Sequence, residues 1–395
     1  MYGITACLLA IALLSIASSA QAPSRPLDIN QIRVPASFRV SIFARMPSAP
    51  RFMVFGPSGN LLVSLMNTGR IASVSPDGQV GTFAQGLAQP HGLAVFGDDL
   101  FVAEQRQVRV YRNMEPARSE VLVSGIPAGG HSTRTIIFGP DGKMYVSIGS
   151  SCNLCNETDE RRAAVVRYNP DGTGQEIFAR GLRNSVGLRW HPVTGELWAT
   201  DNGFDNFGDD RPPEEINIVR QGAHYGWPFC WADRLSNPTF PNPDPAFCQN
   251  TAGAAVQMQA HSAPLGFGFY TGTRFPAEYH GDAFVAFHGS WNRSVPTGYK
   301  IVRVRASDGR AGAVEDFATG WFDGQTASGR PVDVLTGPDG ALYVSDDRAN
   351  IIYRIAYEGA SLNSGGVTNA ASYSPSVAVA PGGLISIFGQ GLFSG

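Results

Sequence analysis

The sequence predicts an all-β protein: a six-bladed β-propeller, followed by a truncated β-sandwich-like C-terminal segment. Two observations carry this prediction, because a short strand motif recurs six times along the chain and strong amphipathic helices are scarce. The composition agrees with it. The 46 glycines and 27 prolines among 395 residues require frequent turns, while 43% hydrophobic residues are enough for a large core.

The repeated motif is a turn rich in Gly, Pro and Asp, followed by a short apolar strand that ends in a small residue. Its six copies, aligned on one strand position, contain Val63, Val102, Val146, Ala199, Val285 and Val344. Neighbouring copies are 39, 44, 53, 86 and 59 residues apart. Because a blade of four short strands takes roughly 40–50 residues, each copy indicates one blade and the longer spacings indicate inserted loops. A β-sandwich with recurrent turns is the alternative.

The two ends of the chain differ from the repeat region. Residues 1–22 contain an apolar run and then Ala20-Gln21-Ala22, a small-x-small cleavage pattern. We therefore expect a signal peptide that is removed near Ala22, and a secreted or periplasmic protein. Residues 30–358 are expected to form the propeller and 359–366 a linker. Residues 367–395 resemble the incomplete start of an immunoglobulin-like module.

The mature chain would hold four cysteines, Cys152, Cys155, Cys230 and Cys248. An even number in an exported protein indicates disulfides, and proximity favours Cys152–Cys155 and Cys230–Cys248. A c-type haem would need a His where the chain has Asn156, and zinc would need further ligands nearby. A redox-active pair would be expected in βαβ surroundings, which are missing.

The charge pattern argues against a nucleic-acid partner. The formal net charge is −3, the chain has only two lysines, Lys143 and Lys300, and no basic tract stands out. Beyond the leader, no segment is long and apolar enough to predict a membrane span.

Several polar residues lie where the blades would meet a central pocket, the expected place for a small ligand. His131 lies just before a predicted strand. Because a histidine can accept a proton near neutral pH, it is the candidate general base, and a structural role is the alternative. Arg183 and Asn184 offer a guanidinium and an amide for carboxylates or quinone oxygens, and Arg330 supplies another cation. Surface ion pairs are the alternative for each arginine.

Two further segments are candidates for ligand binding. The segment from His288 to Arg293 combines the aromatic face of Trp291 with a cation. The acidic loop from Asp201 to Asp210 is dense in oxygen ligands, which suits calcium, although it lacks the spacing of an EF-hand. A solvated loop is the alternative for this segment.

These segments come in the same order as in the glucose/sorbosone dehydrogenases, and the chain most resembles the sorbosone-dehydrogenase-like branch. The matching segments are His131 with the strand after it, Gly181–Asn184, Glu215–Asn217, Tyr225–Pro228, His288–Arg293 and Gly329–Val332. The resemblance covers roughly residues 35–357. It implies a six-bladed propeller with pyrroloquinoline quinone (PQQ) in the central pocket and calcium beside it. It also implies an oxidoreductase that acts on an aldose, a sorbosone-like sugar or an aldehyde.

The resemblance also implies roles for single residues. His131 would take the proton from the substrate hydroxyl as hydride passes to the quinone. The residues that match or lie near cofactor-binding positions of the family are Arg183, Asn184, Trp291, Arg293, Arg330 and Gln89. Gln89 and His91 are alternatives for the same pocket-facing position, and either could reach the pocket. Backbone carbonyls near Asp209 and Asp210 would hold the calcium.

Two other functions are compatible with a propeller. A calcium-dependent lactonase would use axial acids and amides as metal ligands, and Glu104, Asp201 and Asn202 could serve. A non-catalytic propeller that binds carbohydrate or protein is the second alternative. The exact substrate, the electron acceptor and the oligomeric state stay open.

Overall fold

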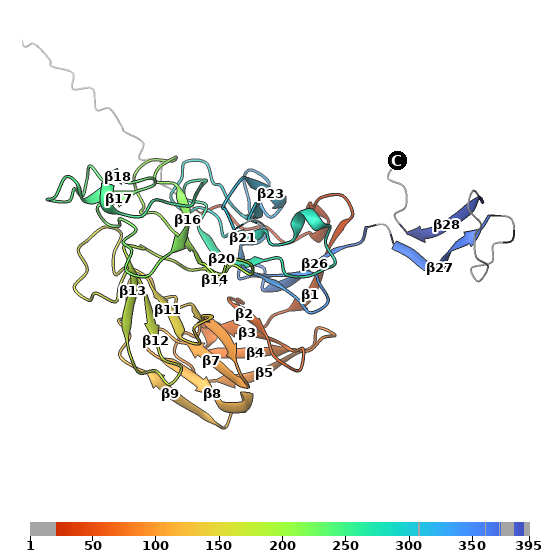
Figure 1. Ribbon diagram of the computed structural model, residues 1–395, viewed down its shortest axis with the longest axis horizontal. Coiled ribbons are helices and arrows are strands. Elements are labelled where there is room, and N and C mark those ends of the chain that lie inside the picture. Colours follow the sequence, from red (N-terminus) through yellow and green to blue (C-terminus); the bar gives the residue numbers. More distant parts are fainter. Residues whose placement is uncertain (1–20, 307–308, 360, 371, 373–382, 391–395) are drawn as a thin grey trace, which may run out of the picture.

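The computed structural model describes residues 21–306, 309–359, 361–370, 372 and 383–390 (Figure 1). These residues form β-strands and five single-turn 3-10 helices, without an α-helix. The 3-10 helices are η1 (Ile29–Gln31), η2 (Met66–Thr68), η3 (Arg112–Met114), η4 (Phe247–Asn250) and η5 (Ala277–Tyr279). Within this part of the chain we find no helix that could serve as a membrane span.

Most of the strands form six antiparallel, four-stranded sheets, which are the blades of a propeller. Blade 1 contains β2 (Met53–Phe55), β3 (Leu61–Leu65), β4 (Arg70–Val74) and β5 (Val80–Gln85). Blade 2 contains β6 (Gly92–Phe96), β7 (Asp99–Ala103), β8 (Val108–Tyr111) and β9 (Ser119–Val123). Blade 3 contains β10 (Ile136–Phe138), β11 (Met144–Ile148), β12 (Ala164–Tyr168) and β13 (Glu176–Arg180).

The other three blades follow the same order from the inner to the outer strand. Blade 4 contains β14 (Leu188–Trp190), β15 (Leu197–Asp201), β16 (Glu214–Val219) and β19 (Val256–Met258). Blade 5 contains β20 (Pro264–Phe269), β21 (Ala283–Phe287), β22 (Lys300–Val304) and β23 (Val314–Ala318). Blade 6 contains β24 (Pro331–Thr336), β25 (Leu342–Asp346), β26 (Ile351–Tyr357) and, from the other end of the chain, β1 (Phe38–Arg45).

The ring of blades is closed by strands from both ends of the propeller. β1 pairs with β26 in antiparallel register, from Phe38 opposite Tyr357 to Arg45 opposite Ile351. The inner strands β2, β6, β10, β14, β20 and β24 each lie beside the next around the axis, and β24 lies beside β2. The six-bladed, all-β prediction is therefore confirmed.

The core of the described residues consists of seven apolar clusters; six lie one between each pair of neighbouring blades, and the seventh joins Phe52, Val186, Leu265 and Val332 from several blades. In β3, for example, Leu61 and Val63 pack toward blade 6, while Leu62 between them packs toward blade 2. Successive side chains of a strand point to opposite faces, and both faces of a blade are covered. This double burial explains why the repeated strand is apolar throughout rather than alternating.

The repeated motif of the sequence forms the second strand of each blade: β3, β7, β11, β15, β21 and β25. Because the second strand is antiparallel to the inner one, it ends at the same face of the propeller where the inner strand begins. Residues that follow second strands and residues that precede inner strands therefore gather at one end of the axis.

Both predicted disulfides are present, Cys152–Cys155 and Cys230–Cys248. The first closes a short loop after β11. The second lies in the long connection between β16 and β19, which also carries the small hairpin of β17 (Cys230–Trp231) and β18 (Leu235–Ser236).

The N-terminal end of the described chain is part of the folded body. The predicted leader falls almost entirely on residues 1–20, which lie outside the described residues. Ala22 is buried; its N–H donates to Tyr299 Oη at 3.2 Å, and its carbonyl accepts from Arg348 at 3.1 Å. Removal of a leader after Ala22 would therefore take away a residue that packs in the propeller.

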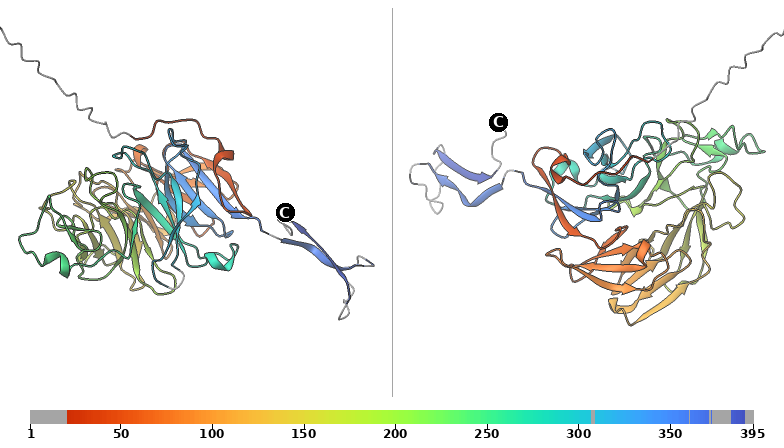
Figure 2. Two further views of the ribbon diagram at one scale, coloured as in Figure 1. Left: turned by 90° about the horizontal axis from the view of Figure 1, so that it is seen from above. Right: turned by 180° about the vertical axis from the view of Figure 1, so that it is seen from behind.

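The C-terminal end forms a separate hairpin that projects from the propeller (Figure 2). β27 (Ser361–Asn369) pairs with β28 (Ile385–Gln390). β27 begins inside the segment expected to be a linker, residues 359–366, and this differs from the expectation. The register shifts between Leu362 and Val367, so the Gly-containing stretch forms an irregularity within a strand. The immunoglobulin-like assignment of residues 367–395 stays a prediction.

Candidate functional site

A cavity of about 460 Å³ lies at the end of the propeller where the inner strands begin. Loops of blades 3, 4, 5 and 6 line it, together with one residue from the N-terminal segment. Its lining residues are Gln21, His131, Arg183, Asn184, Asn202, Gly203, Asp205, Glu214, His261, Ala263, Leu265, His288, Trp291, Asn292 and Arg330. The expected His131, Arg183, Asn184, Trp291 and Arg330 are therefore brought together.

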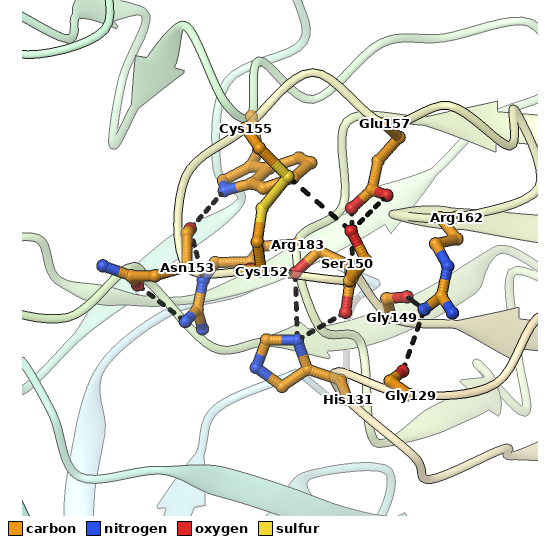
Figure 3. The surroundings of a disulfide bond; sticks show 12 residues. Gly129, His131, Gly149, Ser150, Cys152, Asn153, Cys155, Glu157, Arg162 and Arg183 are labelled. Atoms are coloured by element: carbon orange, nitrogen blue, oxygen red, sulfur yellow. Dashed lines mark hydrogen bonds between the residues drawn. A yellow bond between two sulfur atoms is a disulfide. The ribbon is translucent and has the colours of Figure 1, made fainter.

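His131 is held through one ring nitrogen. Its Nδ1 lies 3.0 Å from the Ser150 carbonyl and 2.9 Å from the Ser150 hydroxyl, which itself donates to the Cys152 carbonyl at 2.7 Å (Figure 3). Both Ser150 oxygens are thus acceptors toward the ring, so Nδ1 carries the hydrogen and Nε2 keeps its lone pair. This tautomer has its basic nitrogen available for a substrate proton.

The surroundings also keep His131 neutral. Burial lowers its pKa to about 4, and the positive charges of Arg183, Arg134 and Arg162 act in the same direction. The His131 side chain packs closely against the backbone of Gly149. If residue 149 carried a Cβ, that atom would lie only 2.6 Å from the Cβ of His131. At neutral pH the imidazole can therefore accept a proton.

Arg183 is almost fully buried and is held on several sides. Its guanidinium pairs with the Asp205 carboxylate at 3.0 Å and donates to the side chain of Asn153 at 2.9 Å and to the Asn202 carbonyl at 3.2 Å. The backbone N–H groups of Arg183 and Asn184 donate to the Asp201 carboxylate. Asp201, at the end of β15, therefore fixes the turn that presents Arg183 and Asn184 to the cavity.

Arg330 differs from Arg183 in its partners. Its guanidinium donates to the carbonyls of His288 at 2.9 Å and Gly289 at 2.5 Å and lies over the Tyr299 ring, with 5.6 Å from Cζ to the ring centroid. Among the described residues no carboxylate forms an ion pair with it. Burial lowers its pKa, so the environment does not compensate this charge fully. An anionic ligand in the cavity would compensate it.

His288 also lines the cavity, but its Nε2 is occupied. It lies 2.9 Å and 3.0 Å from the two carboxylate oxygens of Asp347, which also pairs with Arg51. Burial lowers the pKa of His288 to about 4 despite the opposing charge of Asp347. Because Asp347 accepts the Nε2 hydrogen, that nitrogen cannot take a proton from a substrate.

Neither Gln89 nor His91 lines the cavity. Gln89 is exposed, with a left-handed φ of 55°. His91 is fully buried; its ring packs 4.3 Å from the ring of Phe52, and its Nδ1 lies 3.2 Å from the Arg134 carbonyl. The expectation that one of the two reaches the pocket therefore differs from the structure, because His91 turns into the core.

Arg293, Asp209 and Asp210 form a cluster of their own outside the cavity lining. Arg293 donates to the Asp209 carbonyl, and its guanidinium pairs with the Asp210 carboxylate at 3.2 Å. Ser294 donates to both carboxylate oxygens of Asp209 through its N–H and its hydroxyl. A guanidinium at the Asp209 carbonyl repels a cation, so Asp209 and Asp210 do not fit a calcium ion in this arrangement.

Glu214 and His261 line the cavity although the sequence analysis did not single them out. Glu214 accepts the N–H groups of Gly203 and Ala263, and burial raises its pKa to about 8. His261 Nε2 donates to the carbonyls of Gly208 and Arg211, and its Nδ1 accepts from Asn292 at 3.2 Å. His261 lies just before an inner strand, as His131 does, and that position is the signal that could have identified it.

The three residues considered for a lactonase are not gathered around the cavity. Glu104 is buried against its own blade, where it accepts from the Ala88 N–H at 2.6 Å and pairs with Arg109 at 3.1 Å. Asp201 is occupied by backbone N–H groups, as described above. Only Asn202 lines the cavity.

Comparisons with known proteins agree with this geometry. The model of the TrAA12-like family matches residues 32–358. A Borreliella burgdorferi protein whose name assigns no activity is 32% identical over 83% of this chain and 91% of its own length. The pyrroloquinoline quinone-dependent sugar dehydrogenase of Hypocrea jecorina is 26% identical over 62% of this chain and 70% of its length. In structure, the holo pyranose dehydrogenase PQQ domain of Coprinopsis cinerea matches with a TM-score of 0.72 at 22% identity, covering 85% of this chain and 98% of that one.

Proposed function

The chain belongs to the TrAA12-like family, and from that premise we propose that it is a PQQ-dependent oxidoreductase acting on a small sugar or aldehyde. The substrate class we propose is an aldose, a sorbosone-like sugar or an aldehyde, with His131 as the general base. The curated relatives whose names state an activity are sugar dehydrogenases, which supports the class of reaction.

The observation that carries this proposal is the cationic side of the cavity. PQQ is a planar anion with three carboxylates, and Arg330 lines the cavity as a partly buried guanidinium without a carboxylate ion pair among the described residues. Charge-assisted hydrogen bonds from arginine to carboxylates are among the strongest polar contacts in proteins. Arg183, Asn184 and Trp291 lie on the same cavity, and Trp291 is half exposed at its rim. The residues present therefore fit the cofactor.

The residues of the chain supply the acid–base part of the reaction. PQQ, held by these residues, would supply the acceptor for the hydride that leaves the substrate carbon with two electrons. His131 accepts the hydroxyl proton at Nε2, and its Nδ1–H stays hydrogen-bonded to the Ser150 carbonyl as the ring becomes positive. Arg183 and Arg330 stabilise negative charge in the cavity, where burial strengthens electrostatic interactions.

Calcium is the second cofactor that the resemblance implies, and it conflicts with the contacts of Arg293. In the described ranges, the one group of three His, Cys, Asp or Glu side chains close enough to share a metal ion includes the bridged Cys152 and Cys155. We propose that Arg293 takes the place of a cation at the Asp209 carbonyl. Calorimetry with Ca²⁺ alone tests this: binding by Arg293→Ala but not by the native chain supports it, and binding by the native chain contradicts it.

We also propose that the protein is exported and that Ala22 remains in the mature chain. The support is the burial of Ala22 and its two hydrogen bonds in the propeller. Cleavage between Ala20 and Gln21 also follows a small residue and keeps these contacts. N-terminal sequencing of exported protein decides between the two positions. A mature chain that begins at Pro23 would contradict the proposal.

Dye reduction by the purified protein tests the function. Native protein loaded with PQQ is expected to reduce an artificial electron acceptor with at least one member of a panel of aldoses and aldehydes. The same protein without PQQ is the control, and it is expected to be inactive. Equal activity without PQQ, or lactone hydrolysis in its place, would contradict the proposed function.

A further inference from the structure

We infer that the Cys152–Cys155 disulfide is a positioning element of the cavity, which sets the tautomer of His131 and the place of Arg183. The inference rests on the proposed function, because it concerns the base and the cofactor-binding arginine of that site. It goes beyond a stabilising role for the disulfide. Three features of the loop between the two cysteines carry it.

The first feature is the contact between the loop and Ser150. The Ser150 hydroxyl donates to the Cys152 carbonyl at 2.7 Å, and this bond makes the hydroxyl an acceptor toward His131 Nδ1 (Figure 3). If the Cys152 carbonyl moves away, the hydroxyl is free to rotate and to donate to Nδ1, and the Ser150 carbonyl is then the one remaining acceptor that favours a hydrogen on Nδ1. Nε2 could then carry the hydrogen, and the ring would lose its available basic nitrogen.

The second feature is Asn153, which lies between the two cysteines and holds three parts of the site. Its side-chain oxygen accepts from Arg183 Nη2 at 2.9 Å and from the Asp205 N–H at 2.7 Å, and its amide donates to the Asp205 carbonyl at 3.0 Å. Its backbone carbonyl accepts from Arg183 Nε at 3.2 Å and from Trp227 Nε1 at 3.1 Å. Asn153 therefore joins the disulfide loop of blade 3 to the arginine of blade 4.

The third feature is the difference in exposure between the two disulfides. Cys152 and Cys155 are partly exposed, whereas Cys230 and Cys248 are buried at 4% and 5% exposure. Within the described residues, neither Cys230 nor Cys248 forms a hydrogen bond with a cavity-lining side chain; the Cys248 sulfur contacts the Phe229 carbonyl. The second disulfide is thus a matched control within the same chain.

Nitrogen NMR on protein with isotope-labelled histidine tests the inference without any cofactor. The chain has seven histidines, and the spectrum of His131→Gln identifies the signals of His131. The native protein is expected to show His131 as the Nδ1–H tautomer. The double variant Cys152→Ser/Cys155→Ser is expected to show a mixture of both tautomers. Cys230→Ser/Cys248→Ser is expected to keep the native signals and to show a lower Tm.

The same spectra report the pKa of His131. The titratable groups that line its surroundings or the cavity are Arg134, Arg162, Arg183, Asp205, Glu214, His261, His288 and Arg330. Because Arg183 is a large source of positive charge at the ring, its displacement is expected to raise the pKa of His131 toward its ordinary value. Native tautomer and native pKa in the Cys152→Ser/Cys155→Ser variant would overturn the inference.

If the double variant does not fold, reduction of the disulfide in the native protein provides the same test. A dithiol gives two electrons and two protons to the exposed disulfide and is itself oxidised to a disulfide, while buried Cys230–Cys248 is expected to stay intact. Alkylation and mass mapping identify which pair has opened. His131 signals that shift when Cys152–Cys155 opens support the inference, and unchanged signals overturn it.

Turnover separates this inference from the proposed function. With PQQ bound, the Cys152→Ser/Cys155→Ser variant is expected to lose about 10–100-fold in kcat, since small misplacements of reacting groups have effects of that order. A native protein without PQQ-dependent activity would refute the proposed function but leave the NMR result standing. Full activity together with native His131 signals in the variant would refute the positioning role alone.

Discussion

Blades 1 and 2 differ from the other four blades because none of their residues lines the cavity. They are also the most regular part of the chain. The repeated strands of blades 1, 2 and 3 are 39 and 44 residues apart, whereas 86 residues separate those of blades 4 and 5. The residues between these two strands include Asp205, Glu214, His261 and the second disulfide. The regular blades thus contribute to the ring alone, and the irregular ones also line the cavity.

Two histidines illustrate the same contrast. Both His91 and His131 precede an inner strand, and both lie at the cavity end of the axis. His91, in blade 2, is enclosed by Phe52 and the Arg134 carbonyl, whereas His131, in blade 3, faces the cavity. Equivalent positions in two blades therefore serve packing in one case and line the cavity, where we propose that ligand binds, in the other. The following predictions test that separation.

The largest effect is expected for His131→Gln. Glutamine keeps a hydrogen-bonding side chain but cannot act as a base, so turnover is expected to fall by about 10²–10⁴-fold. PQQ affinity and Tm are expected to stay close to native, because the side chain contacts a loop rather than the core. Steady-state kinetics, PQQ titration and thermal unfolding measure the three quantities. A fully active variant would show that another group takes the proton.

His91→Ala is expected to give the opposite result. Removal of a fully buried ring leaves a cavity in the core, which costs roughly 2–4 kcal/mol of unfolding free energy. The kcat of the protein that remains folded is expected to be native. Denaturant unfolding and kinetics below the unfolding range measure these. If His91→Ala instead lost much of its kcat and kept native stability, the distinction between a packing histidine in blade 2 and a cavity-lining histidine in blade 3 would be wrong.

Arg330→Ala is expected to weaken PQQ binding by about 10–100-fold, the size of a lost hydrogen bond to a charged group. Arg220→Ala is the matched control, because Arg220 is an exposed arginine that pairs with Glu196 away from the cavity. Titration of the apoprotein with PQQ measures both affinities. Equal affinities in the two variants would contradict the role of Arg330.

The number of blades and both disulfides could be predicted from the sequence, because they depend on local patterns. Each second strand must be apolar on both faces, and each cysteine pair is close along the chain. The resemblance to the glucose/sorbosone dehydrogenases also agrees with the family match. Gln89 was assigned to the pocket by the resemblance alone, and Arg293, Asp209 and Asp210 by the resemblance together with the composition of their segments. Their positions depend on tertiary contacts, such as the pairing of Arg293 with the acidic loop.

The smallest effect is expected for pH across the neutral range, and it follows from His131 alone. A general base works when unprotonated, and the pKa of His131 is lowered to about 4 by burial and by Arg183. The kcat/KM is therefore expected to change little above about pH 5 and to fall about tenfold for each unit below the pKa.

The free energy of unfolding is also expected to depend on pH through His131, and the direction of that dependence is defined. Between its folded pKa of about 4 and its ordinary value of 6.5, the unfolded chain binds a proton on this ring that the folded protein excludes. His131 thus makes the free energy of unfolding rise with pH over that window, and His131→Gln is expected to lose this contribution. Unfolding curves of both proteins at several pH values isolate it by difference. If kcat/KM instead falls with an acid limb near the ordinary histidine pKa, the His131 ring is solvated. That is the state expected if the disulfide loop of blade 3 did not hold the ring in place.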